Sequence, residues 1–247
     1  MNIFRETFEK IKLRKRADRY RNKLDKGEIQ YLLSAIANGQ TVMDIGAHKA
    51  GYTYWMVKKA GNSGKIYAFE PQKLLYEYIQ HIKTIYKWDN VHVENLALSD
   101  NASSAILYIP VNNVRASSSP GATIVEEMGH QFIGSTEVVH TESLDSYCNR
   151  SGLKPDFLKI DVEGNELKIF RGGINILQTC KPKILVEIES RHVGEKQVLE
   201  TFEFLISLGY TGHFIHNTSH VPIGAFEFEK HQNQEDMNNY CNNFVFE

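Results

Sequence analysis

The fold of this chain is decided by one stretch, which reads Val42-Met43-Asp44-Ile45-Gly46-Ala47-His48-Lys49-Ala50-Gly51-Tyr52-Thr53. Its apolar beginning predicts a buried strand, its small residues predict a tight turn, and its end predicts the start of a helix. The next apolar run, 65–69, ends at Glu70, about 20 residues beyond the turn. This layout is typical of a nucleotide site, where the turn exposes backbone N–H groups and the acid accepts hydrogen bonds from ribose hydroxyls.

The sequence of the turn disfavours two common classes of nucleotide ligand, dinucleotides and those held by a phosphate-binding loop. His48 stands where a dinucleotide-binding loop has its second glycine, and no Gly-Lys-Ser/Thr follows as it would in a phosphate-binding loop. Acids at the ends of two strands, Asp44 and Glu70, suit a cofactor with a cationic amino-acid end and an adenosine end. The sequence therefore favours S-adenosylmethionine over NAD. The alternative is a glycine-containing turn of some other α/β protein.

The composition indicates a globular chain with a substantial core. The 247 residues carry a formal net charge of −2, and 42% of them are hydrophobic. The balanced charge gives no whole-chain reason to expect nucleic acid as a partner. No apolar stretch approaches the ~20 residues that a transmembrane segment needs, and the first residues lack the apolar core of a secretion signal. Three widely spaced cysteines are typical of reduced thiols in a cytoplasmic protein.

Residues 1–38 are predicted to form a helical extension, with helices at 4–26 and 28–37, ahead of the main domain at 39–247. The first helix contains a basic stretch, 10–16. We expect this stretch to be a solvated helical face, because acids interrupt the positive charge at Glu6, Glu9, Asp18 and Asp25. The alternative is a helix that binds a membrane surface or a partner.

Strands and helices alternate along 39–247, which predicts an α/β fold with a mostly parallel sheet and helices on both faces. Seven strands are expected, at 41–45, 65–70, 91–98, 157–161, 184–189, 212–216 and 242–247. The helices between them are expected at 51–60, 73–86, 143–149, 164–170 and 195–208. A polar stretch, 230–236, is expected to be a loop. An inserted strand pair, 105–109 and 137–141, interrupts the pattern, and the loop 114–123 is expected to act as a lid.

Charged residues gather where the fourth and fifth strands of this sheet end. Alternation along a strand places Lys159, Asp161 and then Glu163 on one face, and the next strand brings Glu187 and Glu189 close to them. Several carboxylates at one buried edge are electrostatically costly unless Lys159, a proton, a cationic cofactor or a divalent metal compensates. Asp161 and Glu187 would be the first metal ligands. The alternative is an ordinary charged sheet rim open to water.

Methyl transfer to a hydroxyl needs a group that removes the acceptor proton. The best base candidates are Asp161, which is the more securely placed, and His192, whose ordinary pKa lies nearer neutral pH. His216 and His220 are weaker candidates, because a lone histidine at a strand end is more often a hydrogen-bonding surface residue.

Several motifs, in order, resemble the FkbM family of S-adenosylmethionine-dependent methyltransferases. They are Asp44-Ile45-Gly46-Ala47-His48-Lys49-Ala50-Gly51-Tyr52-Thr53, Phe69-Glu70-Pro71, Asn95-Leu96-Ala97-Leu98-Ser99-Asp100, Leu144-Asp145-Ser146, Phe157-Leu158-Lys159-Ile160-Asp161-Val162-Glu163-Gly164-Asn165-Glu166 and Leu185-Val186-Glu187-Ile188. The resemblance runs from residue 40 to the C-terminus. His48 replaces the family's usual asparagine, and Ala50 stands where glycine is usual.

The resemblance implies a Rossmann-like class I methyltransferase fold and a set of residue roles. Glu70 would bind the ribose diol, and Asp161, with Lys159 and Glu163 beside it, would stand next to the transferred methyl group. The residues implied to line the cofactor are Asp44, Gly46, Ala47, His48, Gly51, Tyr52, Thr53, Glu70, Pro71, Asn95, Ala97, Leu98, Ser99 and Asp161. The implied acceptor is a hydroxyl of a carbohydrate, glycolipid or secondary metabolite.

Two other functions remain open from sequence. A nucleic-acid methyltransferase would need a basic face with stacking aromatic side chains, and the chain has only one dense basic run, 10–16. A cofactor-binding scaffold without turnover would explain the substitutions at His48 and Ala50. A homo-oligomer is compatible with the sequence, which does not identify the acceptor.

Overall fold

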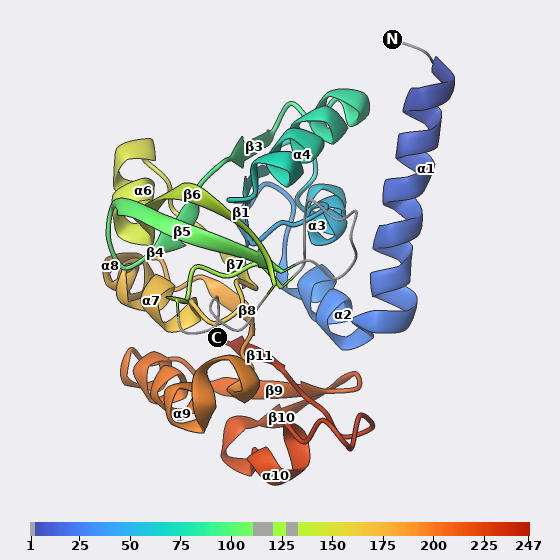
Figure 1. Ribbon diagram of the computed structural model, residues 1–247. Coiled ribbons are helices and arrows are strands. Elements are labelled where there is room, and N and C mark those ends of the chain that lie inside the picture. Colours follow the sequence, from blue (N-terminus) through green and yellow to red (C-terminus); the bar gives the residue numbers. More distant parts are fainter. Residues whose placement is uncertain (1–2, 111–120, 127–132) are drawn as a thin grey trace.

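The computed structural model describes residues 3–110, 121–126 and 133–247, and their strands form one large sheet and one small one (Figure 1). The large sheet has eight strands in the order β10-β9-β11-β8-β7-β1-β2-β3. Their bounds are β1 Thr41–Ile45, β2 Lys65–Phe69, β3 Val91–Glu94, β7 Phe157–Ile160, β8 Lys183–Glu187, β9 Gly212–His216, β10 Ser219–Pro222 and β11 Asn243–Phe246. The first five of these are parallel to one another, and β11, β9 and β10 pair in antiparallel fashion. The mostly parallel α/β sheet is confirmed.

The sheet has one strand more than the seven predicted, and this additional strand is β10. It forms because 217–218 make a two-residue turn that folds the chain back onto β9. Asn217 has a φ of 58°, in the left-handed region that asparagine tolerates better than most residues. A single asparagine is too weak a signal to predict a hairpin between short polar segments.

Helices cover both faces of the large sheet and enclose two apolar cores. One face packs against α2 Lys26–Ala35, α3 Gly51–Ala60 and α4 Lys73–Tyr86, and α1 Ile3–Arg19 packs outside α3 and α4. The other face packs against α6 Leu144–Ser151, α7 Glu166–Arg171, α8 Ile174–Thr179 and α9 Ser190–Ser207. Successive strand residues point to opposite cores: Val42 contributes to the first and Met43 to the second. The short helix α8 was not expected from the sequence.

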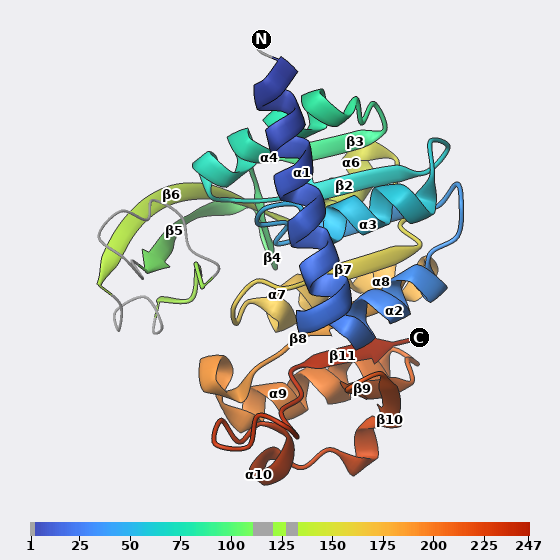
Figure 2. The ribbon, with the colours of Figure 1, turned by 90° about the vertical axis from the view of Figure 1, so that its right-hand side faces the viewer.

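Both helices predicted for the N-terminal segment, 4–26 and 28–37, are present, but the first ends earlier and a π-helical turn separates them. Helix α1 ends at Arg19, the turn η1 spans Tyr20–Leu24, and α2 begins at Lys26. Helix α1 packs across α3 and α4 on one side of the molecule (Figure 2). Leu13 and Ala17 are fully buried there, and Trp55 Nε1 donates a hydrogen bond to the carbonyl of Ala17 at 2.9 Å.

The insertion forms a separate three-stranded sheet made of β4 Ala97–Ser99, β5 Ser103–Pro110 and β6 Gly134–Ser143. The predicted strand pair is thus confirmed, and it is longer than expected. The predicted strand 91–98 is wrong, because it divides into β3 and β4 in different sheets. Asn95 sits at the division, where its side-chain amide donates hydrogen bonds to the carbonyls of Glu70 and Pro71. Most of the expected lid, 114–120, lies outside the described residues.

Two boundaries near the C-terminus also differ from expectation. Strand β8 ends at Glu187, and α9 begins at Ser190 with a break at Gly194, whose φ is 76°. The stretch 230–236, expected to be a loop, starts inside the short helix α10 Phe228–His231, and a 3-10 turn, η2 Ile223–Ala225, precedes it. Among the described helices, none combines the length and apolar character that a membrane-spanning segment needs.

Candidate active site

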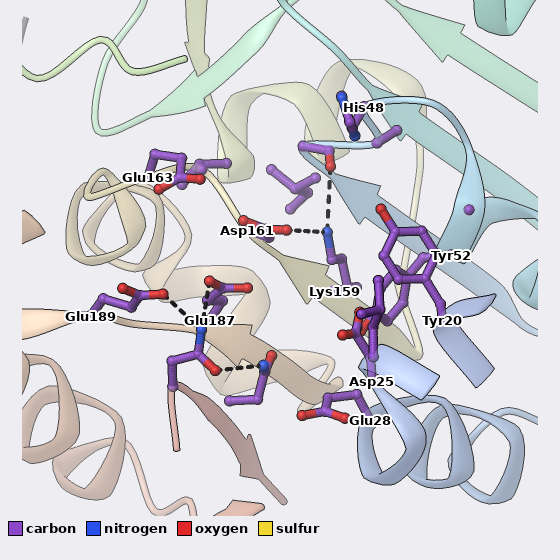
Figure 3. Close-up of a pocket in the computed structure, with 18 of the residues that line it drawn as sticks. Tyr20, Asp25, Glu28, His48, Tyr52, Lys159, Asp161, Glu163, Glu187 and Glu189 are labelled. Carbon is purple, nitrogen blue, oxygen red and sulfur yellow. Dashed lines mark hydrogen bonds and ion pairs between the residues drawn. The ribbon is translucent and has the colours of Figure 1, made fainter. Parts of the chain in front are cut away.

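A cavity of about 970 Å³ opens at the carboxyl ends of β1, β2, β7 and β8 (Figure 3). In an open parallel sheet this is the edge where ligands bind, and the volume lies at the upper end of the range of ligand pockets. The predicted site residues that line it are Gly46, Ala47, His48, Gly51, Tyr52, Glu70, Pro71, Ala97, Leu98, Lys159, Asp161, Glu163, Glu187, Glu189 and His216. The structure therefore brings together residues from both halves of the sequence.

The loop after β1 requires glycine at its first position. Gly46 has a φ of 81°, and a Cβ atom there would lie 1.9 Å from the backbone oxygen of Asp161. The backbone N–H groups of Gly46 and Ala47 both donate to the carbonyl of Phe69 at 3.0 Å. His48 and Ala50 also have positive φ, 49° and 59°. The loop thus lies flat across the ends of β2 and β7, at the floor of the cavity.

Glu70 is held in a fixed orientation beside this loop. Its carboxylate accepts hydrogen bonds from the N–H groups of His48 at 2.8 Å and Gln72 at 2.9 Å. Burial raises the pKa of Glu70 to about 8. The two amides fix the plane of a carboxylate that still has lone pairs for a diol. The position fits the ribose role that the sequence predicts.

Asp44 and Thr53 lie beneath the loop rather than on the wall of the cavity. Asp44 is completely buried, and its Oδ2 accepts a 2.5 Å hydrogen bond from the Thr53 hydroxyl. Its Oδ1 lies 3.8 Å from Lys159 Nζ and has no hydrogen-bond partner in the described structure. Because Asp44 and Lys159 are direct neighbours on β1 and β7, this pair joins the loop to the strand that carries Asp161.

Lys159 supplies the positive charge that compensates the nearby acids. Its Nζ lies 3.1 Å from Asp161 Oδ2, 3.4 Å from the Gly46 carbonyl and 4.9 Å from the centre of the Tyr52 ring. Figure 3 shows Lys159 pointing toward Asp161. Burial disfavours its charge, yet the carboxylates of Asp161 and Asp44 raise the pKa of Lys159 above its ordinary value. A buried ammonium among these groups therefore stays protonated and orients Asp161.

The acids on β8 and just after it are compensated by an amide. Asn242 Nδ2 donates hydrogen bonds of 2.7 Å to both Glu187 and Glu189. Burial raises the pKa of Glu187 well above its ordinary value, whereas hydrogen bonds and Arg191 outweigh burial at Glu189 and lower its pKa. The described residues contain no group of three or more His, Cys, Asp or Glu side chains that could hold a metal ion. Lys159 contacts Asp44 and Asp161, and Asn242 bridges Glu187 and Glu189.

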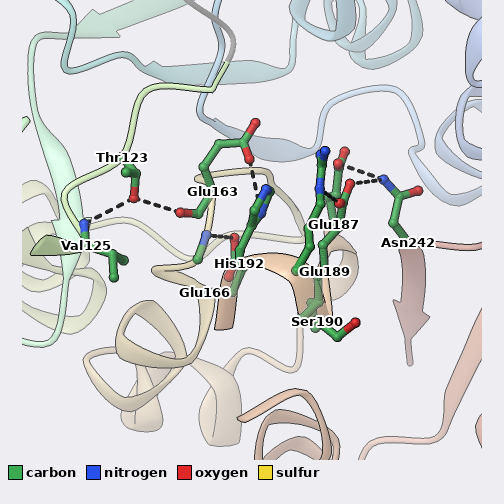
Figure 4. Close-up of polar contacts among 12 residues, drawn as sticks. Thr123, Val125, Glu163, Glu166, Glu187, Glu189, Ser190, His192 and Asn242 are labelled. Atoms are coloured by element: carbon green, nitrogen blue, oxygen red, sulfur yellow. Dashed lines mark hydrogen bonds and ion pairs between the residues drawn. The ribbon is translucent and has the colours of Figure 1, made fainter. Parts of the chain in front are cut away.

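Glu163 and His192 form a pair at the edge of the cavity (Figure 4). His192 Nδ1 lies 3.2 Å from Glu163 Oε2. Burial and the nearby charge of Asp161 raise the pKa of Glu163 to about 8, whereas burial lowers the pKa of His192. Glu163 lines the cavity and His192 does not, so the histidine reaches the cavity only through the carboxylate. The carbonyl of Glu163 also accepts a 2.7 Å hydrogen bond from Thr123 in the insertion.

The sequence profile of the FkbM methyltransferase domain matches residues 44–211 of this chain. The chain belongs to the FkbM methyltransferase family. The predicted resemblance is thus confirmed, and the match contains the loop after β1, Glu70 and the β7 motif.

Solved structures share the fold of this FkbM chain. A methyltransferase FkbM from Methylobacillus flagellatus superposes with a TM-score of 0.55 at 12% identity, over 89% of this chain and 50% of that one. An S-adenosylmethionine-dependent O-methyltransferase from Thermotoga maritima superposes with a TM-score of 0.50 at 11% identity, over 94% of this chain and 69% of that one. This chain thus spans half the length of the Methylobacillus protein. No curated protein sequence matches it.

Part of the cavity wall lies outside the matched FkbM domain. Tyr20, Asp25 and Glu28 come from the N-terminal segment, and Tyr240 and Asn242 come from the C-terminal segment. The sequence analysis missed all five. Asp25 accepts a 2.9 Å hydrogen bond from the Tyr52 hydroxyl, and Tyr240 donates one of 2.9 Å to Glu189. None of the five belongs to a recognisable motif. They can be identified only from the tertiary structure, which brings the two terminal segments next to the domain.

Four other predicted residues lie away from the cavity wall of this FkbM domain. The side-chain amide of Asn95 donates its hydrogen bonds to backbone carbonyls. Ser99 Oγ lies 3.3 Å from Asp100 Oδ1. His220 is on β10, with its ring 5.3 Å from the ring of Tyr31. The fourth is His192, described above. His216 does line the cavity, and its Nε2 is buried without a hydrogen-bond partner in the described structure.

Proposed function

We propose that this chain is an S-adenosylmethionine-dependent methyltransferase that methylates a hydroxyl group of a carbohydrate, a glycolipid or a related polyhydroxylated small molecule. One observation carries the proposal most: a buried glutamate, Glu70, is fixed by two backbone N–H groups next to a glycine loop. Adenosine needs such an acceptor for its ribose diol. The same cavity holds the ion pair between Lys159 and Asp161, with 3.1 Å between Nζ and Oδ2, at the end of strand β7.

The residues present fit S-adenosylmethionine by shape and charge. Gly46 lets the loop pass directly against the Asp161 backbone, and His48 takes the place of the glycine that a pyrophosphate would need. Asp161 offers negative charge, which suits the cationic ammonium and sulfonium groups. The bound cofactor would supply an electrophilic methyl group to the acceptor.

The chain's own part in the reaction is to position the acceptor hydroxyl and to remove its proton. Efficient proton removal favours a base whose pKa lies near the working pH. Glu163 fits, because its pKa is raised to about 8 and its carboxylate lies on the cavity wall. His192 would orient that carboxylate through the 3.2 Å contact. Asp161 is the second candidate, held in place by Lys159.

The part of the cavity wall formed by the N-terminal segment, the start of α3 and the C-terminal segment supports a polyhydroxylated acceptor. Tyr20 and Tyr52 present ring surfaces 5.6 Å apart, between centroids, and Asp25, Glu28 and Asn242 add oxygen and amide groups (Figure 3). Aromatic surfaces combined with several hydrogen-bonding groups are a suitable lining for a sugar.

Thermal unfolding with S-adenosylmethionine, S-adenosylhomocysteine and NAD tests the cofactor. At ~100 times the dissociation constant, a ligand stabilises by about 2.7 kcal/mol, which corresponds to roughly 5–10 °C for a chain of this size. The two sulfur nucleotides should give this shift and NAD should not. Glu70→Gln should reduce the shift, whereas Glu203→Gln, an exposed control on α9, should not.

Methyl transfer itself is tested by incubating the protein with radiolabelled cofactor and a panel of glycans, glycolipids and hydroxylated small molecules. Label incorporated into an acid-stable and base-stable ether would support O-methylation. Binding of cofactor without product across the panel would favour the scaffold function instead. Product on RNA or DNA alone would overturn the small-molecule acceptor.

A further inference from the structure

The outward face of α1 is apolar along one line. Phe4, Phe8 and Ile11 are 84%, 63% and 48% exposed, whereas Leu13 and Ala17 are fully buried against the body of the protein. The spacing of four and three residues places the three exposed side chains on one helical stripe, opposite the buried pair. Figure 2 shows α1 along the outside of the molecule, with its N-terminal end projecting beyond α4.

Acidic and basic side chains lie on different sides of α1. Glu6 and Glu9 are on the half-buried side that faces the body, whereas Lys12 and Lys15 are exposed beside the apolar stripe. Lys12 lies 3.9 Å from Glu9 and Arg14 lies 3.7 Å from Asp18, so the positive charge is only partly neutralised. The sequence predicted a solvated helical face because acids interrupt the basic stretch. Most of these acids lie away from the outward, apolar face of α1.

The positive charge is also concentrated in this part of the chain. Residues 3–24 contain nine Lys and Arg against three Asp and Glu, although the whole chain carries a net charge of −2. The remainder is therefore acidic. Such a separation of charge attracts one side of a protein to an anionic surface and repels the other sides, so it orients the molecule as well as binding it.

We propose that the outward face of α1 docks this protein on an anionic lipid surface, with α1 lying in the plane of the interface. Phenylalanine and isoleucine side chains would enter the boundary between headgroups and acyl chains, and Lys12, Lys15 and Arg19 would contact the anionic headgroups. Charge alone would suit RNA equally well, but the apolar stripe is the part that only a lipid surface or another apolar surface can bury. This inference does not depend on methyl transfer.

Flotation of the full-length protein with vesicles tests the proposal. The protein should float with vesicles of phosphatidylcholine mixed with phosphatidylglycerol, should float much less with phosphatidylcholine alone, and should be released by high salt. The double substitution Lys12→Glu and Lys15→Glu should weaken partitioning by about 30-fold or more, since each basic residue near the surface contributes about a factor of 5. The double substitution Phe4→Ser and Phe8→Ser should weaken it at unchanged charge.

Matched controls separate this face from general surface effects. The pair Lys196→Glu and Lys230→Glu makes the same change in charge elsewhere, and Leu199→Ser and Ile206→Ser remove exposed apolar side chains from α9. Both control pairs should float like the unmodified chain. Absence of flotation, or equal flotation of all variants, would overturn the proposal. So would self-association or RNA binding that is lost in the α1 variants while vesicle binding is absent.

Discussion

At the scale of single residues, the site depends on a few backbone positions as much as on charged side chains. Gly46 turns the chain over the end of β7, and the N–H groups that follow are shared between Phe69 and Glu70. Glu70 in turn owes its orientation to two amides, that of His48 in the loop and that of Gln72 after β2. A substitution in the loop can therefore change the orientation of Glu70 without any side-chain contact to it.

Gly46→Ala should lower the free energy of unfolding by about 2–4 kcal/mol, since it combines the left-handed strain of a non-glycine residue with a collision against the Asp161 backbone. Chemical denaturation measures the change. Gly152→Ala is the matched control: Gly152 has a φ of 62°, but a Cβ there meets nothing within 4 Å. A loss in the control as large as at Gly46 would show that the close approach to Asp161 contributes nothing.

Glu163→Gln should reduce kcat by about 10²–10⁴-fold if Glu163 is the base. A base works when it is deprotonated, so the activity of the unmodified protein should rise with pH through about 8, the raised pKa of Glu163. This rise should vanish in the variant, as measured by a pH profile of kcat. His192→Gln should shift the profile and lower kcat less. If the pH profile of kcat is unchanged in Glu163→Gln, Glu163 is not the base, and Asp161 becomes the candidate.

At the scale of elements, α1 supports the loop after β1 from outside the family domain. Arg16 Nη1 donates to the carbonyl of Lys49 at 3.1 Å and to the Tyr78 hydroxyl at 3.2 Å. The ring of Tyr20 lies so close to Gly51 that a Cβ atom there would be 2.3 Å from it. A loop with two non-glycine residues at positive φ thus has a neighbouring helix to stabilise it.

Arg16→Ala should raise the dissociation constant for S-adenosylmethionine by about 10-fold, because a hydrogen bond from a charged group contributes roughly 1.5 kcal/mol or more. Titration calorimetry measures the constant. Arg16→Lys should restore part of the affinity, whereas Arg19→Ala, an exposed change on the same helix, should leave it unchanged. Equal affinity in Arg16→Ala and the unmodified protein would contradict a role of α1 in the loop.

At the scale of the whole molecule, the fold buries several acids in and near the cavity, and burial raises the pKa values of three of them, Glu28, Glu70 and Glu166. Burial raises the pKa of Glu28 and Glu166 to about 7, and that of Glu70 to about 8. In each case the folded state binds the proton more tightly than the unfolded chain does. The stabilisation is complete below the unfolded value of 4.5 and is lost as the pH rises through the folded value.

The unliganded protein should therefore lose stability between about pH 5 and pH 8, as followed by denaturation at a series of pH values. Glu28→Gln should make this decline shallower between about pH 5 and pH 7 by at most ~1.4 kcal/mol per pH unit, the limit for one proton. Glu195→Gln, at an exposed position, is the control. A decline equally steep in Glu28→Gln would show that Glu28 titrates normally.

The sequence by itself determined most of the strands and helices of the α/β pattern, the loop after β1 and the shared strand face of Lys159 and Asp161, because alternation and local motifs depend on neighbours in the chain. It also determined the family. The tertiary structure alone decided that β4 leaves the main sheet, that α1 supports the loop, and that Asn242 joins Glu187 to Glu189. It decided too which face of α1 is exposed. These features are contacts between residues far apart in sequence, so no local pattern encodes them.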